Sequence, residues 1–225
     1  MSGTIVFDFD NTLVHSRIDF AAIRRELLAL LRDAKHPDFA ANGSEGALTT
    51  LSIGEIIDAG AAHAPAIYDE GWRIVLEYET AGMVAATVEE DAATTLFGLR
   101  DRGFKLAVMT NNAGPATHAA LDLFALRGAF DLVLTRDEVP MKPDPTGILT
   151  AMQQLGYPDR AVMIGDSWLD GVAAGRAGVP FIGFRPRTGI LDERGVAYWS
   201  IVQQLGELVP LLTGPWPARP EGVVR

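Results

Sequence analysis

Two acidic residues lie on either side of Phe9 in the stretch DFDNT, directly after the apolar run Thr4–Phe7. The run is typical of a buried strand, and an ionised carboxylate at the end of such a strand is costly unless it reaches solvent or binds a ligand. Asp8 and Asp10 therefore either begin a capped turn or take part in chemistry. Taken alone, the pair favours the turn.

Polar residues also follow two later strands that the sequence predicts. FKLAVMT ends in Thr110, with Asn111 next, and AVMIGD ends in Asp166. Asp170 comes four residues after Asp166, which places both acids on one face of a helix that begins there. Because ligands bind outside the carboxyl ends of the strands in open α/β sheets, we expect these groups to lie beside the two acids of DFDNT.

The acids at these strand ends have the chemistry of a magnesium site. Mg²⁺ requires hard oxygen ligands, and carboxylates supply them. Clustered carboxylates repel one another unless a cation lies among them, so the predicted metal ligands are the four acids Asp8, Asp10, Asp166 and Asp170. One carboxylate of such a group can act as a nucleophile and another as a general acid or base.

Lys142 is one of only three lysines and lies in the segment EVPMKPDP, where prolines on both sides hold its backbone extended. A point charge there suits an anionic intermediate. Thr110 and Asn111 can donate hydrogen bonds to phosphoryl oxygens. Each feature alone is most simply a surface lysine or an ordinary turn, but their joint occurrence at consecutive strand ends favours chemistry at this edge.

The elements that carry these residues predict an α/β fold. Strands and helices alternate over residues 1–16 and 87–213, which predicts a doubly wound, Rossmann-like parallel sheet covered on both faces. Residues 17–86 have helical spacing of apolar residues and no strand pattern, so they predict an inserted all-helical cap domain. The tail 214–225 is rich in Pro and Gly and is predicted to be extended or mobile.

Four local patterns set helix boundaries. Asp19 is placed to cap one helix and Ser52-x-x-Glu55 forms a capping box for another. Thr87-x-x-Glu90 predicts a second capping box, whose helix ends near Gly103. The stretch WSIVQQLGELVPLL predicts a final helix over residues 199–212.

Composition limits the classes of function. The chain has 225 residues, a net charge of −10 and no cysteine, which argues against nucleic-acid binding and excludes disulfides and thiolate metal sites. It has no basic leader followed by an apolar stretch, and no apolar run approaches the roughly 20 residues of a membrane span. We expect a cytoplasmic protein without nucleic-acid or membrane partners, and the sequence leaves monomer and homodimer open.

Four segments together resemble a known family. DFDNT (8–12), the strand ending in Thr110, KPDP (142–145) and GDSWLDGVAAGRAG (165–178) are similar, in order, to the four motifs of the haloacid dehalogenase-like (HAD) hydrolase superfamily. The helical insertion after the first motif resembles the C1 cap of its phosphoglycolate phosphatase-like and β-phosphoglucomutase-like subgroup.

The resemblance implies a role for each motif residue. Asp8 would be the nucleophile that forms an aspartyl-phosphate, and Asp10 would protonate the leaving group and then activate water, with its backbone carbonyl on Mg²⁺. Thr110 and Lys142 would hold the phosphoryl group, and Lys142 would also restrain Asp8. Among the acids of the last motif, the direct Mg²⁺ ligand would be Asp166, supported by Asp170.

Within the superfamily the motifs favour a phosphatase. Asp10 argues against dehalogenases and phosphonoacetaldehyde hydrolases, which lack this second acid. β-Phosphoglucomutases carry a cap histidine ten residues after that acid, where this chain has Phe20. A non-enzymatic phospho-acceptor or binding module has no use for a general acid beside its nucleophile. The prediction is a Mg²⁺-dependent phosphatase, with a mutase and a binding module as alternatives.

The substrate is expected to be a small phosphorylated metabolite chosen by the cap. Phosphoglycolate, a sugar phosphate and a nucleotide are the candidates, and Arg17 or Arg24 could meet a substrate carboxylate. Two positions depart from the family. His15 stands where relatives commonly have Asp, and we interpret it as a cap-hinge residue without a chemical role. The segment before Lys142 lacks a frequent Gly.

Overall fold

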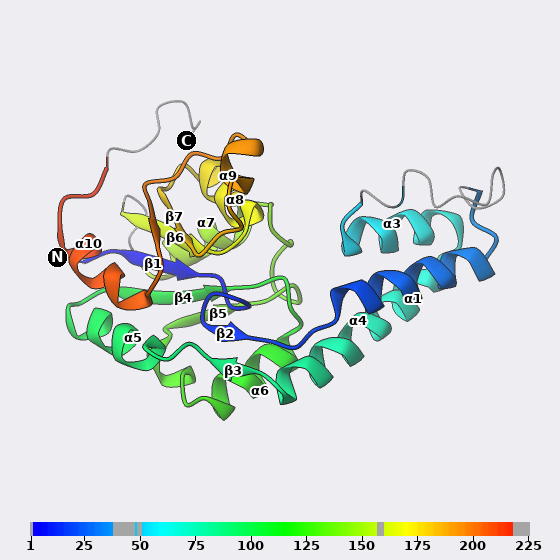
Figure 1. The fold of residues 1–225 in the computed structure, drawn as a ribbon, viewed down its shortest axis with the longest axis horizontal. Helices are drawn as coiled ribbons and strands as arrows, with labels where there is room; N and C mark the ends of the chain where they lie inside the picture. The colour runs from blue at the N-terminus through cyan, green and yellow to red at the C-terminus, as the bar shows by residue number, and fades with distance from the viewer. Residues whose placement is uncertain (1, 38–47, 49–50, 157–159, 218–225) are drawn as a thin grey trace. The chain divides into compact units, whose positions relative to one another are not determined.

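The computed structural model describes residues 2–37, 48, 51–156 and 160–217 (Figure 1). The chain divides into two compact units, one made of residues 1–16 and 86–225 and the other of residues 17–85. The first unit contains the sheet, and the second is an insertion between its first strand and the rest.

A six-stranded parallel sheet forms the centre of the first unit. Its order is β5-β4-β1-β6-β7-β8, so the sheet is built outward from β1 in both directions. The strands are β1 (Thr4–Phe7), β4 (Lys105–Met109), β5 (Leu132–Leu134), β6 (Ala161–Gly165), β7 (Phe181–Phe184) and β8 (Ser200–Val202). The order reverses at β1, and open α/β sheets bind ligands where the order reverses.

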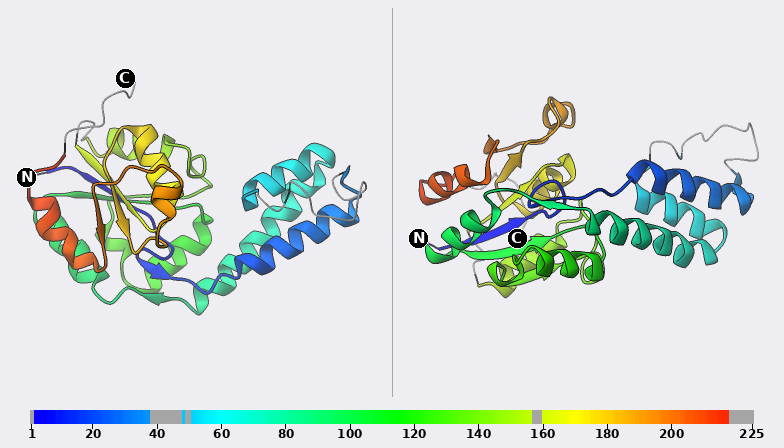
Figure 2. Two further views of the ribbon diagram at one scale, coloured as in Figure 1. Left: turned by 45° about the horizontal axis from the view of Figure 1, so that its top comes forward. Right: turned by 60° about the horizontal axis from the view of Figure 1, so that its bottom comes forward.

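Helices cover both faces of this sheet (Figure 2). The strand order, with the right-handed crossovers typical of parallel strands, assigns α5 (Ala92–Asp101) and α6 (Gly114–Leu123) to one face and α7 (Thr146–Gln154) and α8 (Trp168–Ala177) to the other. The central strand is apolar on both sides because Val6 packs into the α7–α8 cluster while Phe7, on the other face, contacts the ring of Phe130. Short elements complete the unit: η2 (Arg127–Ala129), α9 (Ile190–Glu193), η3 (Leu205–Glu207) and α10 (Leu208–Thr213).

The inserted unit consists of three described helices, α1 (Phe20–Asp33), α3 (Ile53–His63) and α4 (Ala66–Val84). Both predicted caps are present, since Asp19 accepts from the Ala22 N–H and Ser52 forms a capping box with Glu55. Apolar side chains at helical spacing, among them Ile23, Leu27, Leu31, Ile56, Ile57, Ile74 and Val75, are buried between the helices. The doubly wound sheet with an inserted helical domain confirms the predicted fold class.

The predicted final helix over residues 199–212 is wrong in its first half. Ser200–Val202 forms β8 instead and pairs with β7, with Ile182 opposite Ser200. The β-branched residues Ile201 and Val202 suit a strand, and the open edge of β7 offers them backbone partners that local sequence does not reveal. Helical structure begins only after Gln204.

The predicted capping box at Thr87 is also wrong. Thr87 and Val88 form β3, which pairs antiparallel with β2 (Val14–His15), and α5 begins only at Ala92. A distant partner strand overrides a local cap here, because β2 supplies backbone hydrogen bonds. We call this two-stranded sheet, β2 with β3, the flap.

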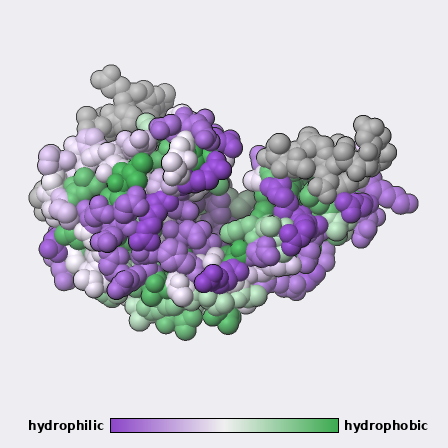
Figure 3. Space-filling view, viewed as in Figure 1, coloured by the Kyte–Doolittle hydropathy of each residue, from purple (hydrophilic) through white to green (hydrophobic). Residues whose placement is uncertain are grey.

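The first residues of the tail pack against the core. Trp216 stacks on Phe104 with 6.2 Å between ring centroids, and its Nε1–H donates to the Leu212 carbonyl over 2.8 Å. Residues 218–225 lie outside the described residues. On the face in view, Figure 3 shows apolar residues in separate patches among hydrophilic ones. No described helix has the length and apolar character needed to cross a membrane.

Gly82, in α4, lies close to the backbone of Ile18 in the segment before α1, and this contact yields a prediction. A Cβ at position 82 would lie 2.6 Å from the backbone nitrogen of Ile18. Alanine ordinarily stabilises a helix interior by about 1 kcal/mol relative to glycine, but this overlap with backbone should make Gly82→Ala destabilising by about 1–3 kcal/mol. Thermal and urea unfolding measure the difference.

Gly175→Ala is the matched control. Gly175 lies inside α8, and no atom comes within 4 Å of a Cβ built there, so this variant should be as stable as the wild type or more stable. A Gly82→Ala protein that gains stability as Gly175→Ala does would contradict the close contact.

Candidate active site

The site lies at the carboxyl edge of three neighbouring strands. Asp8 follows β1, Thr110 follows β4 and Asp166 follows β6, and both β4 and β6 pair with β1. Because the three strands are parallel and adjacent, the residues that follow them meet at one edge. The backbone fixes this edge further, since the Asp8 N–H donates to the Ile164 carbonyl over 2.8 Å.

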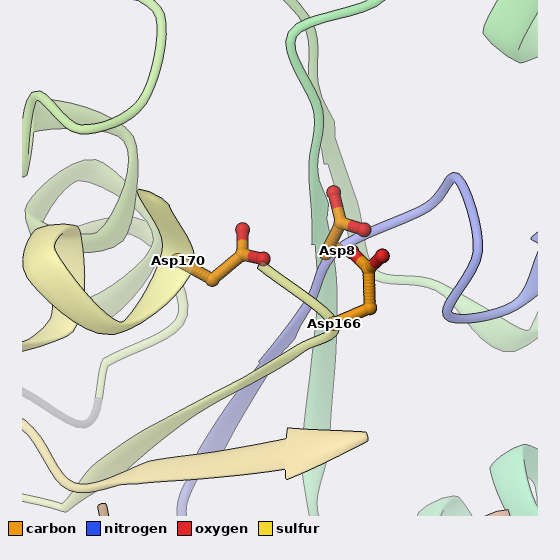
Figure 4. A group of neighbouring side chains, drawn as sticks. All are labelled: Asp8, Asp166 and Asp170. Carbon is orange, nitrogen blue, oxygen red and sulfur yellow. The ribbon is translucent and has the colours of Figure 1, made fainter. Parts of the chain in front are cut away.

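Three acids converge there. Asp8, Asp166 and Asp170 each offer one carboxylate oxygen, and these oxygens lie within 4.8 Å of one another. Figure 4 shows Asp8 and Asp166 coming from strand ends and Asp170 from the first turn of α8. Asp8 and Asp170 are buried. The three side chains thus form one acidic cluster, as the sequence predicted for these positions.

Burial and the charges of neighbouring carboxylates disfavour ionisation of Asp166 and Asp170. Burial, followed by the charges of Asp8 and Asp170, raises the pKa of Asp166 to about 8. The pKa of Asp170 rises to about 6, mainly through burial, although the Lys142 ammonium opposes that rise. Three carboxylates and one ammonium leave an excess of negative charge, and hard oxygen donors in this arrangement fit a divalent cation such as Mg²⁺.

Lys142 is buried among these acids. Its Nζ forms an ion pair with Asp8 Oδ1, and a second with Asp170 Oδ1 at 2.6 Å. Burial lowers the pKa of Lys142, but the two carboxylates outweigh it and keep the pKa above its ordinary value. The lysine is therefore charged, and it holds Asp8 against α8.

The side chain of Asn111 positions Lys142 through two hydrogen bonds with its backbone. The Lys142 N–H donates to Asn111 Oδ1 over 2.7 Å, and Asn111 Nδ2 donates to the Lys142 carbonyl over 3.1 Å. The loop after β4 thereby fixes the backbone of a residue 31 positions later. This two-point contact has no signature in the sequence, because it joins two loops that meet only in the folded chain.

Asp170 has two structural tasks. Its Oδ2 accepts from the Ser167 N–H over 3.0 Å, which completes a capping box at the start of α8. Its Oδ1 faces Lys142. Gly165 makes room for it, since a Cβ at position 165 would lie 2.4 Å from Asp170 Cγ. The turn Gly165–Ser167 thus fixes the position of the Asp170 side chain, and its Oδ1 points toward the acidic cluster.

Two threonines belong to this sheet edge, Thr12 as a partner of Asp8 and Thr110 as the residue that follows β4. Thr12 Oγ1 donates to Asp8 Oδ2 over 3.1 Å, so both oxygens of Asp8 are held. Thr110 is buried, and its Oγ1 accepts from the Asn112 N–H over 3.2 Å. Sequence reasoning proposed Thr110 as a site residue but missed Thr12, although its place four residues after Asp8 in DFDNT was the available signal.

Asp10 lies apart from the three clustered carboxylates. Its Oδ1 accepts from the Ser16 N–H over 3.2 Å and its Oδ2 from the Ser16 hydroxyl over 2.8 Å. Burial raises the pKa of Asp10, the Ser16 hydroxyl opposes this, and the charge of Asp8 adds to it. Sequence reasoning did not find Ser16.

Three other residues named from the sequence, Arg17, Arg24 and His15, make their described contacts outside the acidic cluster. Arg17 is exposed, and its N–H donates to the Gly82 carbonyl. The guanidinium of Arg24 donates to the carbonyls of Leu48 and Leu51 within the inserted unit. His15 contacts Glu89 in the flap region. The structure thus brings Asp8, Thr110, Asn111, Lys142, Asp166 and Asp170 to one sheet edge, whereas the carboxyl group of Asp10 lies outside the acidic cluster.

Comparisons with known proteins agree with this geometry. The profile of a family described as "Hydrolase: haloacid dehalogenase-like hydrolase" matches residues 3–178. A phosphoglycolate phosphatase of Psychrobacter arcticus is 30% identical over 187 residues, which is 80% of this chain and 81% of the relative.

Solved structures share the fold. A predicted phosphoglycolate phosphatase from Haemophilus somnus has a TM-score of 0.67 at 22% identity, covering 93% of this chain and 97% of that one. CbbY from Rhodobacter sphaeroides, solved in complex with phosphate, has a TM-score of 0.65 at 25% identity, covering 92% and 96%. The chain belongs to the haloacid dehalogenase-like hydrolase family, which confirms the family expected from its four motifs.

Proposed function

We propose that this protein is a Mg²⁺-dependent phosphatase that hydrolyses a small phosphomonoester through an aspartyl-phosphate on Asp8. The observation that carries the proposal is the setting of Asp8, a buried carboxylate with one oxygen held by Lys142 and the other by Thr12, next to Asp166. A fixed nucleophile beside a cation site is what phosphoryl transfer requires, because its catalysis consists of positioning and charge neutralisation.

Two proton-coupled steps follow from this arrangement. An oxygen of Asp8 bonds to phosphorus as the bond to the leaving alcohol breaks, and Asp10 gives its proton to the departing oxygen. Water then attacks the phosphorus of the aspartyl-phosphate, Asp10 takes a proton from it, and the bond to Asp8 breaks to release phosphate. Burial shifts the pKa of Asp10 upward, which is the direction that a general acid needs.

The other residues hold charge and geometry. Asp8 and Asp166 would hold the ion, with the backbone carbonyl of Asp10 as a further ligand and Asp170 as their support. When bound, Mg²⁺ would neutralise phosphoryl oxygens and draw the phosphate toward Asp8. Lys142 stabilises negative charge on the transferring group, and Thr110 donates a hydrogen bond to it. The fixed position of Asn111 beside Lys142 supports a role for Asn111 in keeping that lysine in place.

The substrate is proposed as phosphoglycolate or a similarly small phosphomonoester. The proposal is supported by the similarity to proteins named phosphoglycolate phosphatase. Arg17, exposed at the start of the inserted unit, is the candidate for a substrate carboxylate. Arg24 is less suited, since its guanidinium already donates to two backbone carbonyls.

Substitution of the nucleophile tests the mechanism. We expect Asp8→Asn to lower phosphate release by at least about 1,000-fold, because an amide oxygen cannot form the phosphoenzyme. Excess EDTA should abolish the activity of the wild type, and added Mg²⁺ should restore it. The assay is phosphate release from 2-phosphoglycolate, glycerol phosphate, sugar phosphates and nucleoside monophosphates.

The matched control for this test is Asp101→Asn, which removes an exposed acid at the end of α5 and should leave the rate unchanged. Full activity in Asp8→Asn, or in the presence of EDTA, would contradict the mechanism. A wild type inactive on the entire panel would contradict the proposed phosphatase.

The acidic cluster also predicts how stability depends on pH. The folded, metal-free protein binds protons at Asp166 and Asp170 up to pH values of about 8 and 6, whereas the ordinary carboxyl value is 3.8. Between these limits the folded state holds more protons than the unfolded state, so these two acids make stability fall as pH rises. We therefore expect Mg²⁺ to raise the Tm more at pH 8.5 than at pH 5.5.

The shift in Tm should differ between these pH values by at least about 3 °C, as measured by thermal unfolding with EDTA and with Mg²⁺. Asp166→Asn should flatten the pH dependence of the metal-free protein and remove most of the Mg²⁺ effect. An equal Mg²⁺ effect at both pH values would contradict the coupling between proton release and metal binding.

A further inference from the structure

Glu89 is a buried carboxylate outside the acidic cluster, just after the flap. The side chain of Glu89 is only 8% exposed, and carboxylates are rarely buried without charged partners. His15 Nε2 contacts Glu89 Oε2, and Arg185 Nη2 lies 2.6 Å from Oε1. Burial raises the pKa of Glu89, but the hydrogen bonds from His15 and Arg185 outweigh it and lower the pKa overall. We call these three residues the Glu89 cluster.

Arg185 is held in an unusual backbone conformation. Its φ is +42°, in the left-handed region that arginine rarely adopts. Its N–H donates to the Val202 carbonyl over 3.0 Å, and its Nε donates to the Gln203 carbonyl over 2.6 Å. Such strain persists only where the surroundings impose it, and it often marks functional positions. Here it directs the guanidinium from the end of β7 toward Glu89.

The Glu89 cluster fixes the flap to the edge of the sheet. His15 pairs with Thr87 in the flap, and the Glu89 N–H donates to the Leu13 carbonyl over 2.9 Å. The position of His15 is therefore set by backbone pairing on one side and by the Glu89 carboxylate on the other. The next residue, Ser16, is the one that holds both oxygens of Asp10.

We propose that His15, Glu89 and Arg185 are positioning residues for Asp10. Glu89 holds His15 in position, and this fixes the backbone of the next residue, Ser16. Ser16 in turn orients the carboxyl group of Asp10, which transfers the proton. This inference rests on the proposed function and gives it a further part. It also assigns a role to His15, which the sequence alone presented only as a hinge residue.

The physical basis is the sensitivity of proton transfer to small displacements. A misplacement of about 1 Å can cost a rate factor on the order of 100. Removing the charge of Glu89 would leave His15 and Arg185 facing each other without the anion that joins them, so the strand before Ser16 would lose one of its two supports. The carboxyl group of Asp10 would still be present, but its hydrogen bonds with Ser16 would no longer hold it in the orientation needed for proton transfer.

The leaving group of the substrate separates this role from general stabilisation. 4-Nitrophenolate leaves without a proton, whereas the alkoxide of an alkyl phosphate needs one from Asp10. The value of kcat/KM reports the steps through transfer to Asp8. We expect Glu89→Gln to lower kcat/KM for both substrates unequally. The fold loss for the best alkyl monoester of the panel should be at least about five times the fold loss for 4-nitrophenyl phosphate.

Two more variants sharpen the test. Arg185→Lys keeps the charge but loses the two-point contact with Glu89 and Gln203, so it should show the same selectivity change at smaller size. Glu193→Gln removes an exposed carboxylate that pairs with Arg187 at 3.5 Å, and it should change neither substrate. Assays are run well below the Tm of each variant, as measured by circular dichroism.

A double-mutant cycle tests whether the effect passes through Asp10. In an Asp10→Asn background, Glu89→Gln should change the ratio of the two kcat/KM values by less than about twofold, because the group that it positions is gone. An equal loss on both substrates, or the same change in ratio in the Asp10→Asn background, would overturn the inference and leave the phosphatase intact. A wild type inactive on both substrates would overturn both proposals.

Discussion

Electrostatic repulsion between buried carboxylates is the constraint around which the sheet edge is built. Asp8, Asp166 and Asp170 lie close together, and burial together with the charge of Asp8 opposes the ionisation of Asp166 and Asp170. One buried lysine offsets part of this charge. A divalent cation would offset the remaining negative charge, so the arrangement of these carboxylates fits a candidate cation site.

The fold holds the cluster in place through backbone contacts more than through side-chain packing. Asp170 caps its own helix, and Asn111 accepts a hydrogen bond from the backbone of Lys142. The Asp8 N–H continues the hydrogen bonding between β1 and β6. Each of these contacts costs little conformational entropy, because the sheet or α8 already fixes the backbone of the segment that makes it. Charged groups that would otherwise separate are therefore kept within a few ångströms of one another.

Much of this arrangement was predictable from short-range patterns. The alternation of strands and helices indicated the parallel sheet, and the polar residues after each strand indicated which edge carries the chemistry, because parallel strands necessarily bring their ends together. The predictions that failed were local ones. Thr87 and Ser200–Val202 resembled helix starts, but each pairs with a strand outside its own segment, and such pairing is not visible in the local sequence.

The sequence by itself determined the family, the fold class and the identity of the acids at the sheet edge, since strand-end position and residue type are both local properties. Only the tertiary structure decided which groups touch. It directed Asn111 to the Lys142 backbone, Thr12 to Asp8 and Ser16 to Asp10, and it gathered His15, Glu89 and Arg185 from three separate segments. These contacts depend on the angles at which loops leave the sheet, and such angles are set by long-range packing rather than by the residues of any one loop.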